Sequence, residues 1–226
     1  MVTRMTCAWL SLISLGLVAC APELVKLDPA ARESLKHTPE IRVIHYFPPD
    51  LKVQGTARVG YGASAGTSVA MHAQAMDQLA ADLIVQDPVL RIKANVVNSL
   101  SKMLEPSALT SLPTPMQELQ VDRLKGVLGP GTVMDFATTY WGIAPLPYNP
   151  HDLVMYRARA RLLRFPEGTL LWQGSCDLEA EDSLGMPIDK GSPVTKGVLL
   201  SNTLTRLADR CSEQLVAQFS GSSSTP

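Results

Sequence analysis

Apolar residues recur every three or four positions in two long segments of the chain. Between residues 88 and 103 they form the stripe Val89, Ile92, Val96, Leu100 and Met103. A second stripe lies between residues 193 and 219 and consists of Leu200, Leu204, Leu207, Cys211, Leu215 and Phe219. This period predicts two amphipathic helices that each bury one face. Asp87–Pro88 and Ser192–Pro193 mark their starts, since short polar side chains cap helices and proline fits the first turn.

Shorter helices are predicted at three other places. Asp28 followed by Pro29 predicts a helix over residues 29–36. Helical spacing from Val69 to Leu83 places His72 among apolar positions, where we interpret it as a packing residue. Pro106 and the segment 105–113 end the helix that begins near residue 88. Thr114 and Gln117 match a capping box, which predicts a helix that ends near Gly129.

Two segments have the composition of single strands. Residues 40–47 alternate apolar and polar side chains and are followed by two prolines. Residues 132–142 are rich in threonine, valine and aromatic residues. The prolines at 145, 147 and 150 predict a loop after this second strand, and the glycine-rich stretch 55–66 predicts another loop.

The clearest local pattern is a β-hairpin with strands 153–165 and 169–180 around Pro166, Glu167 and Gly168. Its register follows from the requirement that both apolar faces coincide. This places Leu162 opposite Trp172, Ala158 opposite Cys176 and Arg157 opposite Asp177. It also pairs Phe165 with Thr169 and assigns Leu170 to the core face.

These elements predict an α+β fold: a small antiparallel or mixed sheet, formed by the C-terminal hairpin and a meander, that is packed by several helices. We expect a single domain over residues 40–219. A tether and a short helix over residues 20–39 precede it, and a disordered serine-rich tail over residues 220–226 follows it.

The first residues resemble the signal of a bacterial lipoprotein. Arg4 precedes an apolar stretch, and Leu17, Val18, Ala19 and Cys20 match the lipobox in which a cysteine thiol is acylated before cleavage. We therefore expect residues 1–19 to be a signal peptide and Cys20 to carry the lipid. An ordinary secretory signal that contains a cysteine is the alternative. Ala21 in the position after the cysteine favours the outer membrane, by the sorting rule of enteric-type lipoproteins.

The remaining cysteines predict a disulfide. Export places Cys176 and Cys211 in an oxidising compartment, and the loss of Cys7 with the signal leaves them as the two available thiols. The predicted elements point both of them at the boundary between the sheet and the last helix. Neither has a second cysteine or a histidine at metal-ligand spacing, so we expect no metal site and no cofactor.

Composition and charge exclude several classes of function. The 226 residues are 46% hydrophobic, which is typical of a folded domain rather than a disordered chain. The formal net charge of −1 provides no basic footprint for nucleic acid. No apolar run reaches the roughly 18 residues that a membrane span needs.

Side chains with candidate chemistry gather in two places. Arg157, Arg159 and Arg161 share one strand face, which is interpreted either as a site for an acidic partner or as a solvated face. Gly62 to Gly66 matches the nucleophile elbow of α/β-hydrolases, with Ser64 as nucleophile and Asp135 and His151 as triad partners. The poor strand before Ser64 and the proline-rich surroundings of His151 disfavour this hydrolase. Trp141 and Trp172 are interpreted as core residues.

The hairpin, with its phrase Leu171, Trp172, Gln173, Gly174, and the C-terminal helix with Cys211 resemble poorly characterised Gram-negative envelope lipoproteins. The phrase also resembles the curli-secretion and penicillin-binding-protein-activator lipoproteins. This resemblance implies a non-catalytic adaptor that helps to assemble or regulate an envelope complex, with other envelope proteins as partners. An anchored serine hydrolase that uses Ser64 and a carrier of a lipidic ligand are the alternatives.

Overall fold

The computed structural model describes residues 24–54, 83, 85–105, 107–118, 120–145, 152–181 and 193–222. In this part the helices are α1 (Pro29–Lys36), α3 (Val89–Met103), α4 (Val121–Leu128) and α5 (Pro193–Ser220). The strands are β1 (Glu40–His45), β2 (Lys52–Val53), β3 (Ala108–Ser111), β4 (Gly131–Pro145), β5 (Asp152–Phe165) and β6 (Thr169–Glu181).

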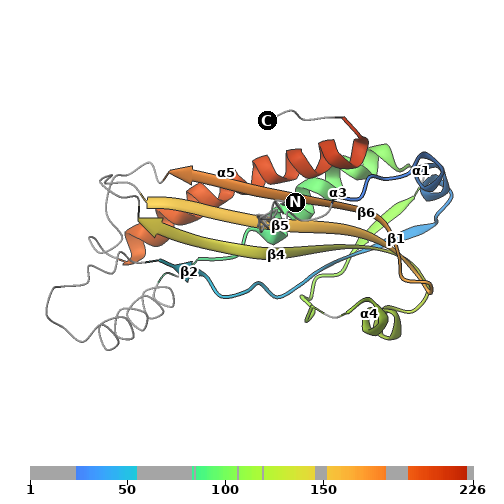
Figure 1. Cartoon of the computed structure of the whole chain (residues 1–226), viewed down its shortest axis with the longest axis horizontal. Helices are drawn as coiled ribbons and strands as arrows, with labels where there is room; N and C mark the ends of the chain where they lie inside the picture. Colours follow the sequence, from blue (N-terminus) through green and yellow to red (C-terminus); the bar gives the residue numbers. More distant parts are fainter. Residues whose placement is uncertain are drawn as a thin grey trace, which may run out of the picture.

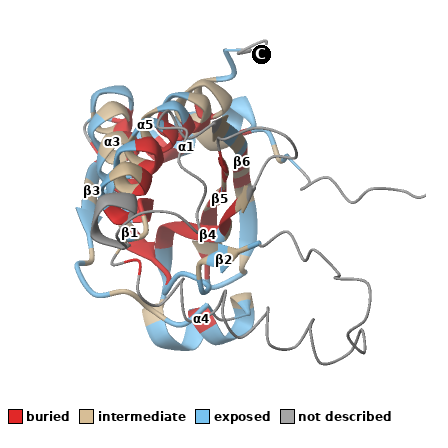
Figure 2. Ribbon diagram, turned by 90° about the vertical axis from the view of Figure 1, so that its left-hand side faces the viewer, coloured by how far each residue is buried: buried red, intermediate tan, exposed pale blue. Residues whose placement is uncertain are grey.

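The six strands form one mixed sheet in the order β3-β1-β4-β5-β6, with β2 beside β4. β1 runs parallel to both β3 and β4, whereas β4, β5 and β6 form an antiparallel meander. Helices α1, α3 and α5 lie over one face of the sheet, and α4 lies over the other (Figures 1 and 2). The α+β class predicted from the sequence is therefore correct.

The main core lies between the sheet and α3 and α5. The apolar stripes of both helices are buried there against alternate residues of β1, β4, β5 and β6. Trp141 and Trp172 belong to this core, and Trp172 packs edge-to-face against Phe219 with ring centroids 5.1 Å apart. Burial of large side chains on both layers is the dominant stabilising contribution.

A second, smaller core lies between the opposite sheet face and α4. It contains Ile44, Tyr46, Leu124, Val133, Ala137, Leu163 and Phe165. Arg42 of β1 donates hydrogen bonds to the carbonyls of Leu128 and Pro130 where α4 ends. A cation at that position stabilises α4, because the carbonyls at a helix C-terminus carry partial negative charge.

The hairpin register is correct over most of its length. Leu162 pairs with Trp172, Ala158 with Cys176 and Arg157 with Asp177. Near the turn the prediction is wrong, because the register shifts after Leu162 and Arg164 rather than Phe165 pairs with Thr169.

The register shift is a β-bulge, and it changes which leucine faces the main core. Leu163 pairs with Leu170, so Leu171 is the extra residue of β6. Leu171 packs against the main core, whereas Leu170 is 36% exposed instead of facing the core as expected.

Two predictions for residues 105–120 are also wrong. The expected break contains β3, which pairs with β1 from Glu40–Ala108 to Val43–Ser111. The capping box at Thr114 and Gln117 is absent, because Met116 instead pairs with Tyr46 as an isolated parallel bridge. α4 begins only at Val121, although it ends at Gly129 as expected, with that glycine at φ 68°.

The helix expected over 29–36 is present with Asp28 as its cap, and the helices at 88 and 193 begin as predicted. β4 extends to Pro145, so this proline ends a strand rather than lying in a loop. The glycine-rich stretch 55–66 and the helix expected from Val69 fall outside the described residues.

Candidate functional site

Three of the four arginines of β5, Arg157, Arg159 and Arg161, lie on the face that carries α4, and each forms an ion pair. Arg157 pairs with Asp177 at 2.9 Å, Arg159 with Glu118 at 2.5 Å and Arg161 with Asp135 at 2.6 Å. The exposed fraction of the side chain falls along the row, from 47% to 21% to 14%. The interpretation as a solvated face therefore holds at Arg157 and is wrong at Arg161.

Asp135 of β4, the partner of Arg161, is fully buried. Arg161 donates to both of its carboxylate oxygens, and the Tyr46 hydroxyl donates to Oδ2 at 2.8 Å. Burial raises the pKa of Tyr46, and the neighbouring carboxylate raises it further. The three side chains form a polar cluster at the smaller core, in which Asp135 and Tyr46 are buried and Arg161 is partly exposed.

This cluster bears on the hydrolase hypothesis. A triad acid orients a histidine through a hydrogen bond, but in Asp135 both oxygens already accept bonds from Arg161 and Tyr46. Ser64 and His151, the other members of the hypothetical triad, lie outside the described residues.

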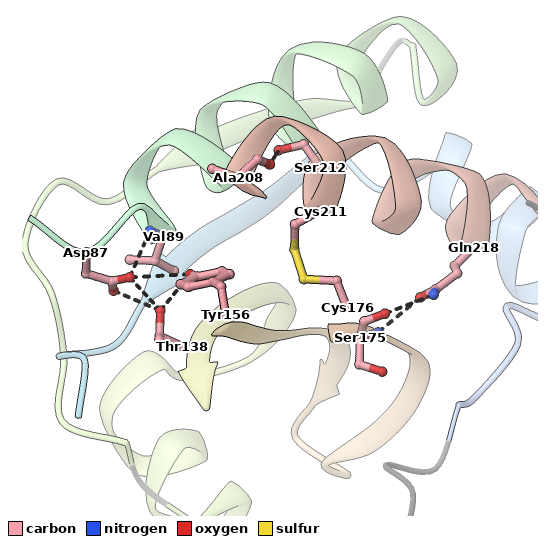
Figure 3. The surroundings of a disulfide bond; sticks show 10 residues. All are labelled: Asp87, Val89, Thr138, Tyr156, Ser175, Cys176, Ala208, Cys211, Ser212 and Gln218. Carbon is pink, nitrogen blue, oxygen red and sulfur yellow. Dashed lines mark hydrogen bonds between the residues drawn. A yellow bond between two sulfur atoms is a disulfide. The ribbon is translucent and has the colours of Figure 1, made fainter. Parts of the chain in front are cut away.

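The sequence-predicted cysteine pair is joined in the structure. Cys176 of β6 and Cys211 of α5 form a disulfide with their Cα atoms 5.5 Å apart (Figure 3). Both are buried in the main core, 2% and 0% exposed. The bond links the sheet covalently to its longest covering helix.

A half-buried carboxylate, Asp87, lies just before α3. Asp87 accepts hydrogen bonds from the hydroxyls of Thr138 and Tyr156 at 2.7 and 3.3 Å and from the Val89 N–H at 3.2 Å (Figure 3). Burial raises the pKa of Asp87, and these hydrogen bonds partly offset that effect. The cluster ties the first turn of α3 to β4 and β5.

A second buried polar pair joins α3 to β1. The Lys93 ammonium lies 3.0 Å from His45 Nδ1 and donates to the Leu112 carbonyl at 3.0 Å. Burial lowers the pKa of Lys93, while burial followed by the charge of Lys93 lowers that of His45. In the described part of the chain neither side chain forms an ion pair with a carboxylate.

The outer edge of β6 has two partners of different kinds. Val25 exchanges both backbone hydrogen bonds with Gln173, at 3.1 and 2.9 Å. Two residues further along, the Gln218 carboxamide accepts from Ser175 N–H and donates to its carbonyl (Figure 3). A segment N-terminal to α1 and a side chain of α5 thus cover the middle of this edge.

A groove of about 730 Å³ runs between α3 and α5 on the outer surface. Its lining is mostly polar and includes Asn95, Asp209, Ser212 and Glu213, with Met103 and Val216 as apolar contributions. Asp209 is held by Arg91 and Asn95.

Across the described residues, no group of three or more metal-ligating side chains is close enough to hold an ion. Nor does this part of the chain contain a helix with the length and hydropathy to cross a membrane. Cys20, the expected lipidation site, lies outside the described residues.

No known family profile matches the chain, and no curated protein sequence matches it. Among solved structures, a PelC dodecamer from Paraburkholderia phytofirmans aligns at TM-score 0.37 and 9% identity, covering 87% of this chain and 95% of that one. Lipoprotein GNA1162 from Neisseria meningitidis aligns at TM-score 0.27 and 16% identity over 75% and 98%. Protein XCC0632 from Xanthomonas campestris aligns at TM-score 0.34 and 12% identity over 80% and 86%. The neighbours thus include a lipoprotein, but at these scores the likeness carries no conclusion about function.

Sequence reasoning missed the polar cluster around Asp87, the buried Lys93–His45 pair and the covering of the β6 edge. A lysine in the stripe of α3 was a usable signal, because Lys93 follows Ile92 and shares the buried side of the helix. The roles of Val25 and Gln218 leave no sequence signal, since each depends on which strand lies at the edge of the sheet.

Proposed function

We propose that this chain is an outer-membrane lipoprotein whose periplasmic domain is a non-catalytic adaptor in the assembly or regulation of an envelope complex. One observation carries the proposal: the disulfide between Cys176 and Cys211, buried in the main core. Disulfides of this kind persist in oxidising compartments such as the periplasm. The lipobox at Cys20 predicts export to the same compartment. Stable membrane anchoring takes two lipid chains or a comparable pair of signals, and a triacylated cysteine exceeds this requirement.

Two experiments test the lipid anchor and the oxidising compartment. Radiolabelled palmitate should enter the wild-type protein and not Cys20→Ser, with Cys7→Ser as the matched control that keeps its label. Equal labelling of wild type and Cys20→Ser would refute the anchor. Mass analysis of the mature protein under non-reducing conditions should detect no free thiol, and two alkylatable thiols would refute the oxidised state.

The adaptor role is supported by the contacts that the polar side chains make. In the described residues, the polar clusters around Asp135 and Asp87 join structural elements, and their carboxylates already accept hydrogen bonds from neighbouring side chains. Arg157 is the arginine of the β5 row that remains accessible to a partner. We therefore expect contact with an envelope protein near the exposed end of this row.

Photo-crosslinking in intact envelopes tests the partner. A photoreactive residue in place of Arg157 should trap a specific protein, whereas one at Lys102, exposed on α3 over the opposite sheet face, should not. Identical products from both positions, or none from Arg157, would contradict this surface.

The hydrolase alternative has its own test. The purified domain should not react with a fluorophosphonate probe, because the proposed triad acid Asp135 is occupied by Arg161 and Tyr46. Stoichiometric labelling that disappears in Ser64→Ala would replace the adaptor by an anchored serine hydrolase.

A further inference from the structure

The segment that precedes α1 is fixed to the domain from Val25 onward. Val25 is paired with Gln173 on the β6 edge, Leu27 is 8% exposed in the main core, and Asp28 caps α1. One turn later, Arg32 donates to the carbonyls of Phe219 and Ser220 where α5 ends. These contacts make residues 25–36 part of the rigid domain rather than a free linker.

Gln218 ends the pairing of this segment with β6. In an antiparallel ladder, the next hydrogen-bonded pair after Val25–Gln173 would join Ser175 to the residue two positions before Val25. The Gln218 carboxamide already occupies both Ser175 groups, at 3.0 and 2.9 Å. The backbone groups of Ser175 are therefore not available for further strand pairing on this edge.

The distance from this point to the lipid is short. Five Cα–Cα steps, across four intervening residues, separate Cys20 from Val25 in the sequence. Even fully extended, they span at most about 18 Å. The opposite edge of the sheet, β3, is four strand spacings from β6, which adds about 19 Å.

We propose that this short tether holds the β6 edge, with Leu24, Lys26 and Leu170, against the lipid surface in which Cys20 is anchored; this inference rests on the proposed lipidation. Leu24 and Leu170 are 55% and 36% exposed, and Lys26, two residues after Leu24, is also exposed. Leucines at the headgroup boundary and a lysine near lipid phosphates are the side chains that such a surface accepts.

The charges of β6 indicate which half of the edge lies nearest the lipid. Asp177 and Glu179 are both exposed, and both follow Ser175, the residue whose backbone groups bind Gln218. Carboxylates are repelled by anionic lipid headgroups. The first half of β6, from Thr169 to Ser175, has no carboxylate, so we place it nearest the bilayer, with the exposed Glu167 of the preceding turn at the margin of the contact.

The orientation can be measured in vesicles. The lipid-modified protein would be purified from membranes and reconstituted into phosphatidylethanolamine–phosphatidylglycerol vesicles that contain a lipid with a nitroxide headgroup. A thiol-reactive fluorophore would be attached at Thr169→Cys on β6 or at Thr110→Cys on β3, both exposed positions. The native disulfide leaves Cys176 and Cys211 unreactive.

The expected result is quenching at Thr169 at least about twofold greater than at Thr110, given the two edges' different maximum distances from the anchor. A twenty-residue glycine–serine insertion between Ala21 and Pro22 should abolish the difference. Equal quenching at the two sites, stronger quenching at Thr110, or no effect of the insertion would overturn the inference. Flotation of the vesicles is scored separately: protein that does not float would overturn the proposed lipid anchor, and with it this orientation.

Discussion

Gln218 of α5 hydrogen-bonds both backbone groups of Ser175, accepting from its N–H at 3.0 Å and donating to its carbonyl at 2.9 Å. A helix side chain thus provides at the sheet edge what a neighbouring strand residue would provide. Exposed edges invite pairing with other chains, and covering them is one of the ways in which proteins prevent it. Here the covering side chain comes from the same helix that the disulfide fixes, at Cys211, two turns earlier.

Replacing this side chain should open the edge. Gln218→Leu leaves the two Ser175 groups without their partner, and we expect a loss of about 1–3 kcal/mol in the free energy of unfolding. Hydrogen exchange at the Ser175 amide should accelerate in the same variant. Gln214→Leu is the matched control on the same helix, because Gln214 makes no hydrogen bond to the sheet within the described residues. Equal stability of the two variants would argue against the role of Gln218.

Gly174 lies next to the contact between Gln218 and Ser175. A Cβ built on it would lie 2.6 Å from the Trp172 ring and 2.7 Å from Gln218 Oε1. Because Trp172 is fully buried and cannot move aside freely, Gly174→Ala should destabilise the domain by about 1–3 kcal/mol.

The control for Gly174 is a glycine with the opposite expectation. A Cβ added to Gly126, in the exposed part of α4, would have no other atom within 4 Å, so Gly126→Ala should stabilise the domain by up to about 1 kcal/mol. Denaturant unfolding of both variants provides the comparison. A Gly174→Ala protein as stable as wild type would show that the Trp172 ring can adjust.

The Leu-Trp-x-Gly phrase therefore has a structural explanation. The sequence alone shows only that this motif resembles one in other lipoproteins, and it does not reveal what the motif does physically. In the fold, Gly174 leaves room on the core face for the indole of Trp172, which packs against Phe219. The requirement depends on a contact between β6 and α5, which are distant in sequence.

The periodicity of apolar residues predicted the elements correctly where one face is buried over several helical turns or several strand residue pairs. The stripes of α3 and α5 and the central hairpin register are of this kind. In the hairpin, a one-residue shift would move every side chain to the other face of the sheet. Predictions were wrong where pairing is short and non-local. β3 spans four residues, and the Met116–Tyr46 bridge replaces a local capping box. No local pattern distinguishes those outcomes.

The candidate site was only partly predictable for the same reason. The pairing of Cys176 with Cys211 followed from the compartment and the predicted faces. The partners of the arginines did not, since Asp135 and Glu118 come from β4 and the segment before α4. Burial of Arg161 depends on α4 covering the sheet at that end, which the row Arg157, Arg159, Arg161 does not reveal.

The two ends of this row should differ strongly in their contribution to stability. Arg161→Met leaves the Asp135 carboxylate buried without its partner, and breaking a buried pair in this way costs about 3–5 kcal/mol. Arg157→Met, on the same strand and face, removes an exposed pair with Asp177, so we expect a change within about 1 kcal/mol. Chemical denaturation of both variants tests the difference. Similar losses at the two positions would contradict the burial of the Asp135 cluster.

The His45–Lys93 pair should make stability depend on pH in the mildly acidic range. Burial and the nearby ammonium lower the pKa of His45 in the folded protein, whereas an unfolded histidine titrates near about 6.5. Above that pH the imidazole is neutral in both states. As the pH falls below it, the unfolded chain binds a proton that the folded chain does not, so the free energy of unfolding decreases toward the lowered folded pKa.

The measurement is the free energy of unfolding at several pH values between about 7.5 and 5.5, on either side of the unfolded pKa, for wild type, His45→Gln and His37→Gln. His45→Gln removes the titrating group, so its stability should fall less steeply than that of wild type, by up to about 1.4 kcal/mol per pH unit for one proton. His37 is 79% exposed, so His37→Gln is the matched control that replaces an exposed histidine, and its slope should stay closer to that of wild type than the slope of His45→Gln. The comparison of slopes is independent of any constant loss caused by the substitution itself. Parallel curves for wild type and His45→Gln would mean that His45 takes up its proton equally in the folded and unfolded chain, and that the Lys93 ammonium does not oppose its charging.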